Sequence, residues 1–155
     1  MSDFEDLNIS TAIEGLRKKE FTSSELTQFF IEKISNNKKL NCFITSTFDL
    51  AMKMAKDSDN KISKNQNLGL LEGIPIGMKD LFCTNGVKTT AGSKILENFI
   101  PYYESTVSQN LWNEGAVMLG KTNMDEFAMG SANTTSYFGN VINPLKSLEN
   151  SKDLV

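Results

Sequence analysis

Histidine is absent from this sequence of 155 residues, and cysteine occurs only twice, as Cys42 and Cys83. A chain without histidine cannot by itself build a Ser-His-Asp triad, a Cys-His pair or most kinds of zinc site. The two cysteines lack C-x-x-C spacing, so we interpret them as free thiols buried in a reducing compartment. Cys83 is not favoured as a nucleophile, because no histidine is available to activate it.

Long apolar runs and an excess of positive charge are also lacking. No stretch reaches the roughly 20 apolar residues that span a bilayer, and the acidic N-terminus does not resemble a signal peptide. The formal net charge of −3 argues against direct binding to nucleic acid or to an anionic membrane. With 39% hydrophobic and 23% charged residues, the composition is that of a soluble globular protein, which we expect to be cytoplasmic and to have no membrane partner.

Helix signals dominate residues 1–60, which we interpret as a helical region. The capping-box spacing of Thr22 and Glu25 predicts a helix that ends near Asn36. An earlier helix is predicted as well, and three residues are candidates for its start: Asn8, Ser10 and Thr11.

The rest of the helical region is predicted in three pieces. Residues 42–45 read as a short strand, and Asp49 could cap a third helix. The polar stretch 57–67 contains a single apolar residue, so we interpret it as a flexible surface loop.

From residue 73 onward, short apolar strands alternate with helical patterns. One strand ends at Lys79, and a second covers residues 116–119. The helix between them should turn Val107, Leu111 and Trp112 inward and end at Gly115. Strands alternating with helices predict an α/β fold, in which residues 73–155 form the start of the core.

The stretch Gly73–Asp80 is the one around which the chain is organised. Its apolar residues alternate, and Gly77, which has no side chain, would let another backbone or a ligand approach the opposite face. We expect Lys79 at the end of a buried strand, where burial would lower the pKa of its ammonium and free a neutral amine to act as a base. The alternative is that Lys79 is a solvated charge at the end of a strand.

The same stretch resembles the start of the amidase signature family. The match continues through residues 81–93 and resumes over the more discriminating block of residues 119–131. That block is more similar to the subunits of tRNA-dependent amidotransferases than to the simple amide hydrolases of the family. The resemblance implies a large mixed β-sheet flanked by helices, in a single amidase domain that is considerably longer than residues 1–155.

Residues 115–122, with the sequence GAVMLGKT, match the phosphate-binding pattern G-x-x-x-x-G-K-[ST]. That pattern binds phosphate when a strand precedes an open loop and a helix follows the loop. Here a helix is predicted before the motif, and its four middle residues are apolar and read as the strand itself. We therefore do not predict nucleotide binding at Lys121.

In the family that this chain resembles, a lysine acts as the base through a bridging serine, which activates a second, nucleophilic serine. Lys79 matches the family lysine, and Gly130 and Ser131 are candidates for the substrate-binding side of the site. A tight turn that needs glycine explains Gly130 equally well. The two serines belong to a glycine- and serine-rich signature expected where this chain stops, at Val155, so the 155 residues alone are expected to be inactive.

The resemblance also implies partners. A complete protein of this kind would hydrolyse glutamine and use the ammonia to convert Glu-tRNA(Gln) to Gln-tRNA(Gln), in a heterotrimer with B and C subunits. No metal or cofactor is predicted in this chain, and ATP, Mg²⁺ and the tRNA would be bound through a partner subunit. Two alternatives stay open: a truncated or split-gene product that acts as an interaction or complementing piece, and a fragment of a related amide hydrolase.

Overall fold

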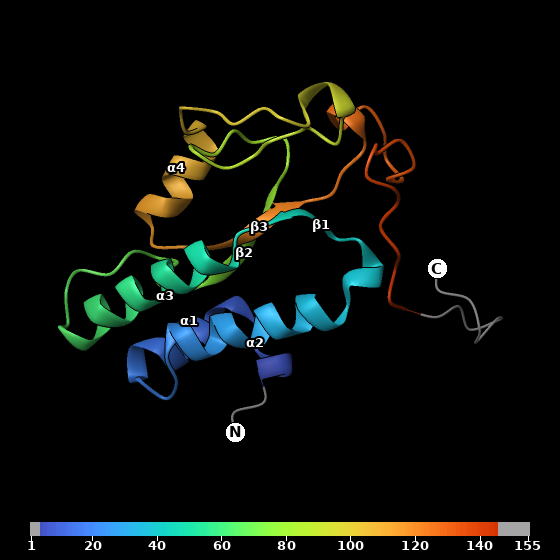
Figure 1. Ribbon diagram of the computed structural model, residues 1–155. Helices are drawn as coiled ribbons and strands as arrows, with labels where there is room; N and C mark the ends of the chain where they lie inside the picture. The colour runs from blue at the N-terminus through green and yellow to red at the C-terminus, as the bar shows by residue number, and fades with distance from the viewer. Residues whose placement is uncertain (1–3, 146–155) are drawn as a thin grey trace.

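The computed structural model describes residues 4–145 and confirms the α/β fold. A mixed three-stranded sheet lies at its centre, in the order β1-β3-β2. β1 (Phe43–Ser46) runs antiparallel to β3 (Val117–Thr122), and β3 runs parallel to β2 (Pro75–Lys79). The sheet therefore joins a strand from the first 60 residues to two strands from later in the chain (Figure 1).

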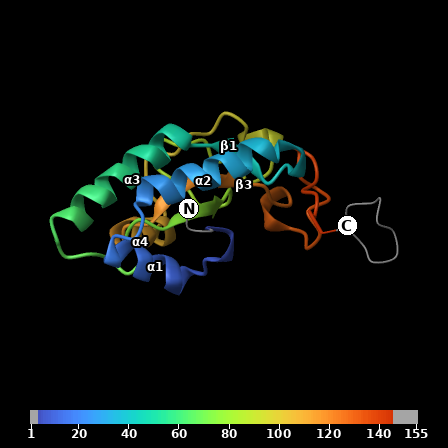
Figure 2. The ribbon, with the colours of Figure 1, turned by 90° about the horizontal axis from the view of Figure 1, so that it is seen from below.

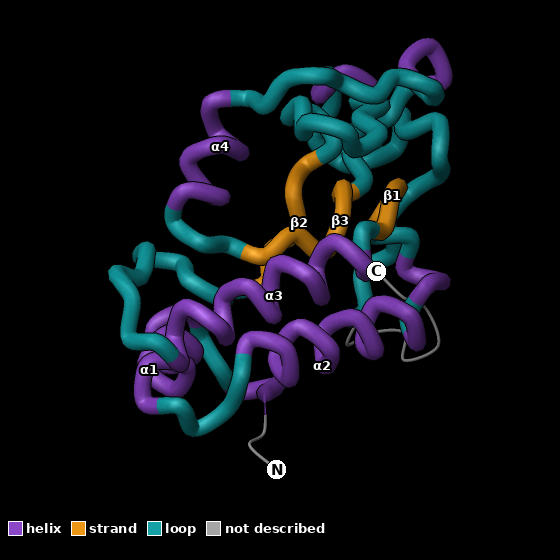
Figure 3. Tube along the Cα trace, turned by 60° about the vertical axis from the view of Figure 1, so that its left-hand side comes forward, coloured by secondary structure: helices purple, strands orange, loops and turns teal. Residues whose placement is uncertain are grey.

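Helices cover one side of this sheet. Figures 1 and 2 show α1, α2 and α3 on the same side of the strands, whereas α4 lies with irregular segments on the other side. Figure 3 shows the strands leading from the helical layer toward a loop-rich end of the molecule. Within residues 4–145, no helix is long and apolar enough to cross a membrane. The bounds are α1 Ile9–Lys18, α2 Ser23–Asn36, α3 Phe48–Ser63 and α4 Thr106–Asn113, with 3-10 turns η1 Phe4–Asp6, η2 Lys38–Leu40, η3 Lys94–Leu96 and η4 Glu126–Ala128.

The first two helices begin with capping boxes. Asn8 caps α1, its side chain accepting from the Thr11 amide at 3.0 Å, so the earliest of the three candidate starts is correct. Thr22 and Glu25 form the predicted box at α2, and the helix ends at Asn36 as predicted. Each box satisfies backbone N–H groups that the first turn of a helix leaves without a partner.

The third helix corrects two predictions. It begins after Thr47 rather than at Asp49, and it continues to Ser63 through more than half of the stretch 57–67 that we interpreted as a flexible loop. The polar residues of that stretch have partners in other elements, which is why they fold. The Ser58 hydroxyl donates to the buried Glu72 carboxylate, and Asp59 accepts from the amides of Ser23 and Ser24 at the start of α2.

Two apolar clusters hold the helices to the sheet. Fully burying a valine, leucine, isoleucine or phenylalanine side chain contributes about 1.5–3 kcal/mol, so each cluster stabilises the packing of its helices. The first cluster joins α1, α2 and the end of α3 to the residue before β2, through Ala12, Leu16, Phe21, Leu26, Ile62 and Ile74. The second joins α3 to β3 through Ala51, Ala55, Val117 and Leu119.

Polar contacts position α4. Its cap is Ser105, and the fully buried Ser108 donates a hydrogen bond to the carbonyl oxygen of Cys83 at 3.1 Å. Val107, which we predicted to point inward, is 47% exposed, so that prediction is wrong. The helix is closed by Gly115 at φ +83°, as predicted, a backbone conformation that glycine adopts without strain.

Candidate active site

Lys79 is the last residue of β2 and lies opposite Thr122 of β3 in the parallel register. Its carbonyl oxygen accepts from the Phe82 amide at 3.1 Å, which fixes the turn that leaves the strand. The side chain is exposed, so the expectation that it is buried is wrong. Successive residues of a strand face opposite sides, and it is the neighbours Met78 and Asp80 that point into the interior.

Gly77 lies on the same face of β2 as Lys79, and both residues are exposed. A β-carbon built on Gly77 would lie 2.7 Å from Cγ2 of Thr122, closer than such atoms approach in proteins. Glycine at this position therefore lets β2 and β3 pair without pushing the Thr122 side chain aside. A close approach does occur at Gly77, but it comes from the Thr122 side chain of the neighbouring strand and not from the backbone or ligand that we predicted.

The buried lysine of this region is Lys121. Its side chain and that of Asp80 are both 0% exposed, and Lys121 Nζ lies 4.0 Å from Asp80 Oδ1. Burial lowers the pKa of the Lys121 ammonium, and the Asp80 charge opposes that shift. Burial likewise raises the pKa of the Asp80 carboxyl, against the Thr90 hydrogen bonds and the Lys121 charge.

Sequence reasoning missed this pair. Asp80 was visible only as a residue after a strand, and Lys121 only as part of a phosphate-binding pattern. The position of Lys121 within an apolar strand could have indicated this pair. A lysine inside a buried strand needs an internal partner, since isolated charges are expensive to bury.

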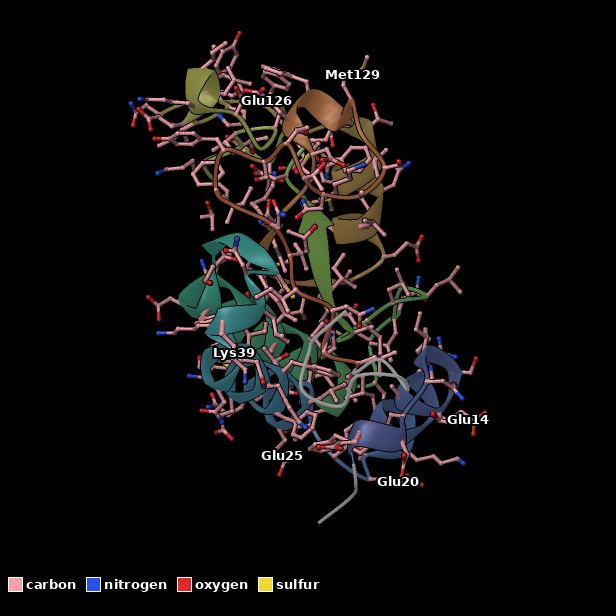
Figure 4. The ribbon with its side chains drawn as sticks, turned by 90° about the vertical axis from the view of Figure 1, so that its right-hand side faces the viewer. Glu14, Glu20, Glu25, Lys39, Glu126 and Met129 are labelled. Carbon is pink, nitrogen blue, oxygen red and sulfur yellow. The ribbon has the colours of Figure 1, made fainter. Side chains whose placement is uncertain are left out.

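Gly130 and Ser131 follow η4 at the loop-rich end of the molecule. Figure 4 shows Glu126 and Met129 at that end, opposite Glu14, Glu20 and Glu25. A β-carbon on Gly130 would fall 2.5 Å from Cγ of Asp125, so glycine is required there by packing. Ser131 is exposed. A substrate-binding role for these two residues stays a prediction.

Asp125 organises the turn that contains Gly130. Its carboxylate accepts from three consecutive amides, those of Asn133 and Thr134 at 2.8 Å and that of Thr135 at 3.0 Å. These hydrogen bonds, led by the one from Thr135, hold the pKa of the Asp125 carboxyl below its ordinary value. Asp125 therefore fixes the loop of residues 133–135, and we call this set of hydrogen bonds the Asp125 clamp. Nothing in the sequence pattern had indicated this role.

A short path of backbone hydrogen bonds links this turn to β2. The Phe127 amide donates to the Ala91 carbonyl at 2.8 Å, and the Ala91 amide donates to the Asp80 carbonyl at 3.0 Å. Among residues 4–145, no hydrogen bond or ion pair joins Lys79 itself to Gly130 or Ser131. The two parts of the candidate site are therefore connected through Ala91 and Asp80.

The stretch 115–122 has the structural context that we inferred for it. α4 precedes it, and Val117–Thr122 is β3, the middle strand of the sheet, with its side chains largely buried. The amides of a middle strand pair with the strands on either side, so they do not form an open cradle for phosphate. In the described part of the chain, no group of three or more His, Cys, Asp or Glu residues could hold a metal ion.

Comparison with known proteins defines the class. Residues 25–151 match the model of the amidase family, and the chain belongs to that family. All 155 residues are 56% identical to the A subunit of the glutamyl-tRNA(Gln) amidotransferase of Rickettsia bellii, and 149 residues are 56% identical to the same protein of Caulobacter vibrioides. The chain spans 31% and 30% of the length of these two relatives and corresponds to their N-terminal portion.

Solved structures support the same fold. The peptide amidase of Stenotrophomonas maltophilia superimposes with a TM-score of 0.84 at 26% identity, over 93% of this chain and 31% of its own. A chain of a vestigial protein complex that reveals the evolutionary origins of an s-triazine catabolic enzyme gives a TM-score of 0.85 at 29% identity. That match covers 96% of this chain and 32% of the other.

Proposed function

We propose that this chain is the lysine-bearing N-terminal part of the glutamine-hydrolysing subunit of a tRNA-dependent amidotransferase. The complete enzyme would release ammonia from glutamine and use it to convert Glu-tRNA(Gln) to Gln-tRNA(Gln). The observation that carries the proposal is the contrast in identity. The chain is 56% identical to the A subunit of the Rickettsia bellii enzyme but 26% identical to a peptide amidase of the same fold.

The geometry suits such a role for Lys79. The residue ends a strand whose backbone pairs with β3, and its exposed side chain lies on the same face of the strand as the exposed Gly77. In the proposed reaction Lys79 accepts a proton from a bridging serine, and that serine takes the proton of the nucleophilic serine that attacks the amide carbon of glutamine. Both serines would lie in the two-thirds of the relatives' length that this chain does not match.

The remaining functions belong to partners in this proposal. The B and C subunits would complete a heterotrimer in the cytoplasm, and ATP, Mg²⁺ and the tRNA would be bound through a partner subunit. The net charge of −3 supports this division, because a tRNA-binding surface is ordinarily basic. The stretch around Lys121 supports it too, since residues 117–122 form a strand and not a phosphate-binding loop.

Reconstitution tests the proposal. The 155-residue chain is combined with a polypeptide that carries the unmatched remainder of the Rickettsia bellii A subunit, together with the B and C subunits of that organism. Ammonia release from glutamine is then measured. We expect release only when the chain and the remainder are both present, because the base and the nucleophile lie on different pieces.

The controls separate the alternatives. Release by the chain alone, or by the remainder alone, would contradict the division of the site. An assembly that ignores glutamine but hydrolyses simple amides would instead identify a related amide hydrolase. Stable association without hydrolysis of either substrate would identify a non-catalytic interaction piece.

A further inference from the structure

The feature that the proposed function leaves unexplained is the buried pair of Asp80 and Lys121. Both side chains are 0% exposed, although neither residue type is ordinarily found inside a protein. The separation of 4.0 Å between Nζ and Oδ1 is too long for a hydrogen bond, so their attraction is electrostatic. Each side chain makes its hydrogen bonds with other groups, and those groups reveal what the pair does.

Asp80 holds the loop that returns to β2. Its Oδ2 accepts from the Thr90 amide at 2.9 Å and from the Thr90 hydroxyl. Its backbone amide donates to Thr122 at 3.1 Å, and its carbonyl accepts from Ala91 at 3.0 Å. The residue immediately after Lys79 is thus tied to the neighbouring strand and to the loop at once.

Lys121 holds the other side of the same turn. Its ammonium donates to the Phe82 carbonyl, to the Thr89 hydroxyl at 2.8 Å and to the Thr84 hydroxyl at 3.3 Å. Phe82 in turn donates its amide to the Lys79 carbonyl at 3.1 Å. Lys121 lies beside Met78 in the register of β2 and β3, one residue before the partner of Lys79.

We propose that Asp80 and Lys121 form a positioning pair, which fixes the turn that follows Lys79 and so sets the direction in which its amine leaves the sheet. A lone buried charge of either sign is strongly disfavoured, so each residue requires the other. The pair also explains the lysine of the phosphate-binding pattern. Lys121 stabilises the turn after β2 through its hydrogen bonds to Phe82 and Thr89. The catalytic meaning of the positioning rests on the proposed function, whereas the structural claim does not.

Amide hydrogen exchange of the whole 155-residue chain tests the structural claim. In Lys121→Met we expect the amides of Phe82, Thr90 and Ala91 to exchange at least about tenfold faster, because the bonds around them loosen locally. The amide of Leu26, bonded to Thr22 in α2, should keep its wild-type rate. The exposed Lys88 supplies the matched control, and Lys88→Met should change every rate less than about twofold.

A double variant keeps the test decisive if the single variant unfolds. Asp80→Asn combined with Lys121→Met removes both buried charges, and its exchange rates should fall between those of wild type and Lys121→Met. This non-additivity is the signature of two residues that act on each other. Strictly additive effects, unchanged rates in Lys121→Met, or equal acceleration of all amides including Leu26 in the double variant would each overturn the proposal.

The reconstituted enzyme tests the catalytic consequence. We expect the double variant to lower kcat for ammonia release by about tenfold or more with little change in KM, because a misdirected base affects the chemical step. An unchanged kcat would overturn the positioning role. If the wild-type assembly releases no ammonia, the proposed function fails on its own, and the exchange measurement still decides the pair.

Discussion

Two regions of this molecule differ in the contacts that stabilise them. The first, residues 4–79, contains α1–α3, β1 and β2, and its helices bury apolar faces in two clusters. The second, residues 80–145, has α4 and β3 among long irregular segments (Figure 3). Most of the exposed large apolar side chains lie in this second region, among them Tyr102 at 88%, Met129 at 83% and Ile95 at 82%.

Outside β3, polar clamps order much of the second region. Asp125 binds three amides of one loop, the Asn41 side chain donates to the Phe138 carbonyl at 2.8 Å, and the Asn123 side chain donates to the Gly139 carbonyl at 2.9 Å. Such contacts order a loop without burying apolar side chains. Exposed apolar side chains are frequent at interfaces, and we expect the rest of an amidase domain to cover these.

The largest effect should come from the core of the first region. Leu16 is 1% exposed, and Leu16→Ala should lower the free energy of unfolding by about 3 kcal/mol, through lost burial and the cavity that is left. Leu70, which is 71% exposed, is the matched control, and Leu70→Ala should change it by less than about 0.5 kcal/mol. Urea unfolding measures both, and equal effects would remove the contrast between buried cluster and exposed surface.

Loss of the Asp125 clamp should have a local effect. In Asp125→Ala the amides of Asn133, Thr134 and Thr135 lose their acceptor, so their hydrogen exchange should accelerate while that of α2 stays unchanged. Asp57→Asn, at an exposed position of α3, is the control. Acceleration that spreads to α2 would show that the two regions fold as one unit.

The same carboxylate makes stability depend on pH. Hydrogen bonds lower the pKa of Asp125 in the folded chain below the value of about 3.9 that an unfolded aspartate has. The stabilisation is therefore complete above that unfolded value and is lost as the pH falls through the lower folded pKa. Unfolding followed from pH 7 to pH 2 should show a smaller acid loss for Asp125→Asn than for wild type, and identical slopes would contradict the clamp.

Smaller effects are expected on the exposed face of the second region. Tyr102→Ser and Met129→Ser should each leave the stability of the chain within about 0.5 kcal/mol, because these side chains bury little. The same variants should weaken association with the remainder of the Rickettsia bellii protein, measured by titration calorimetry. Unaltered association would show that this face is not the interface.

No effect at all is expected from nucleotide. Titration of ATP with Mg²⁺ into the chain should produce no heat of binding, because Lys121 is fully buried and committed to neighbouring groups. A micromolar site lost in Lys121→Ala would contradict the assignment of residues 117–122 to a strand.

The first region could be predicted from the sequence in most of its elements. The Thr22 capping box and the end of α2 near Asn36 were read correctly, because helix signals are local. The stretch 57–67 was misread, since its polar residues are ordered by distant partners such as Glu72. No local pattern records such a partner.

The candidate site could be predicted only in part. Lys79 was placed correctly at a strand end, but its burial was assigned wrongly, because the alternation of a strand decides which neighbour points inward. The true buried lysine, Lys121, depends on a contact between residues 41 positions apart, Asp80 and Lys121. Contacts between residues so far apart in the sequence are created by strand pairing, so they can be identified only when the fold is known.

The most direct test of this account is ammonia release by the reconstituted enzyme with Lys79 changed. Lys79→Ala should reduce kcat by at least about 100-fold, the usual contribution of a general base. Lys79→Arg should fail as well, since a guanidinium stays protonated and cannot accept a proton, and Lys88→Ala should retain full activity. Near-normal turnover in Lys79→Arg would contradict the account and leave Lys79 as a solvated charge at the end of a strand.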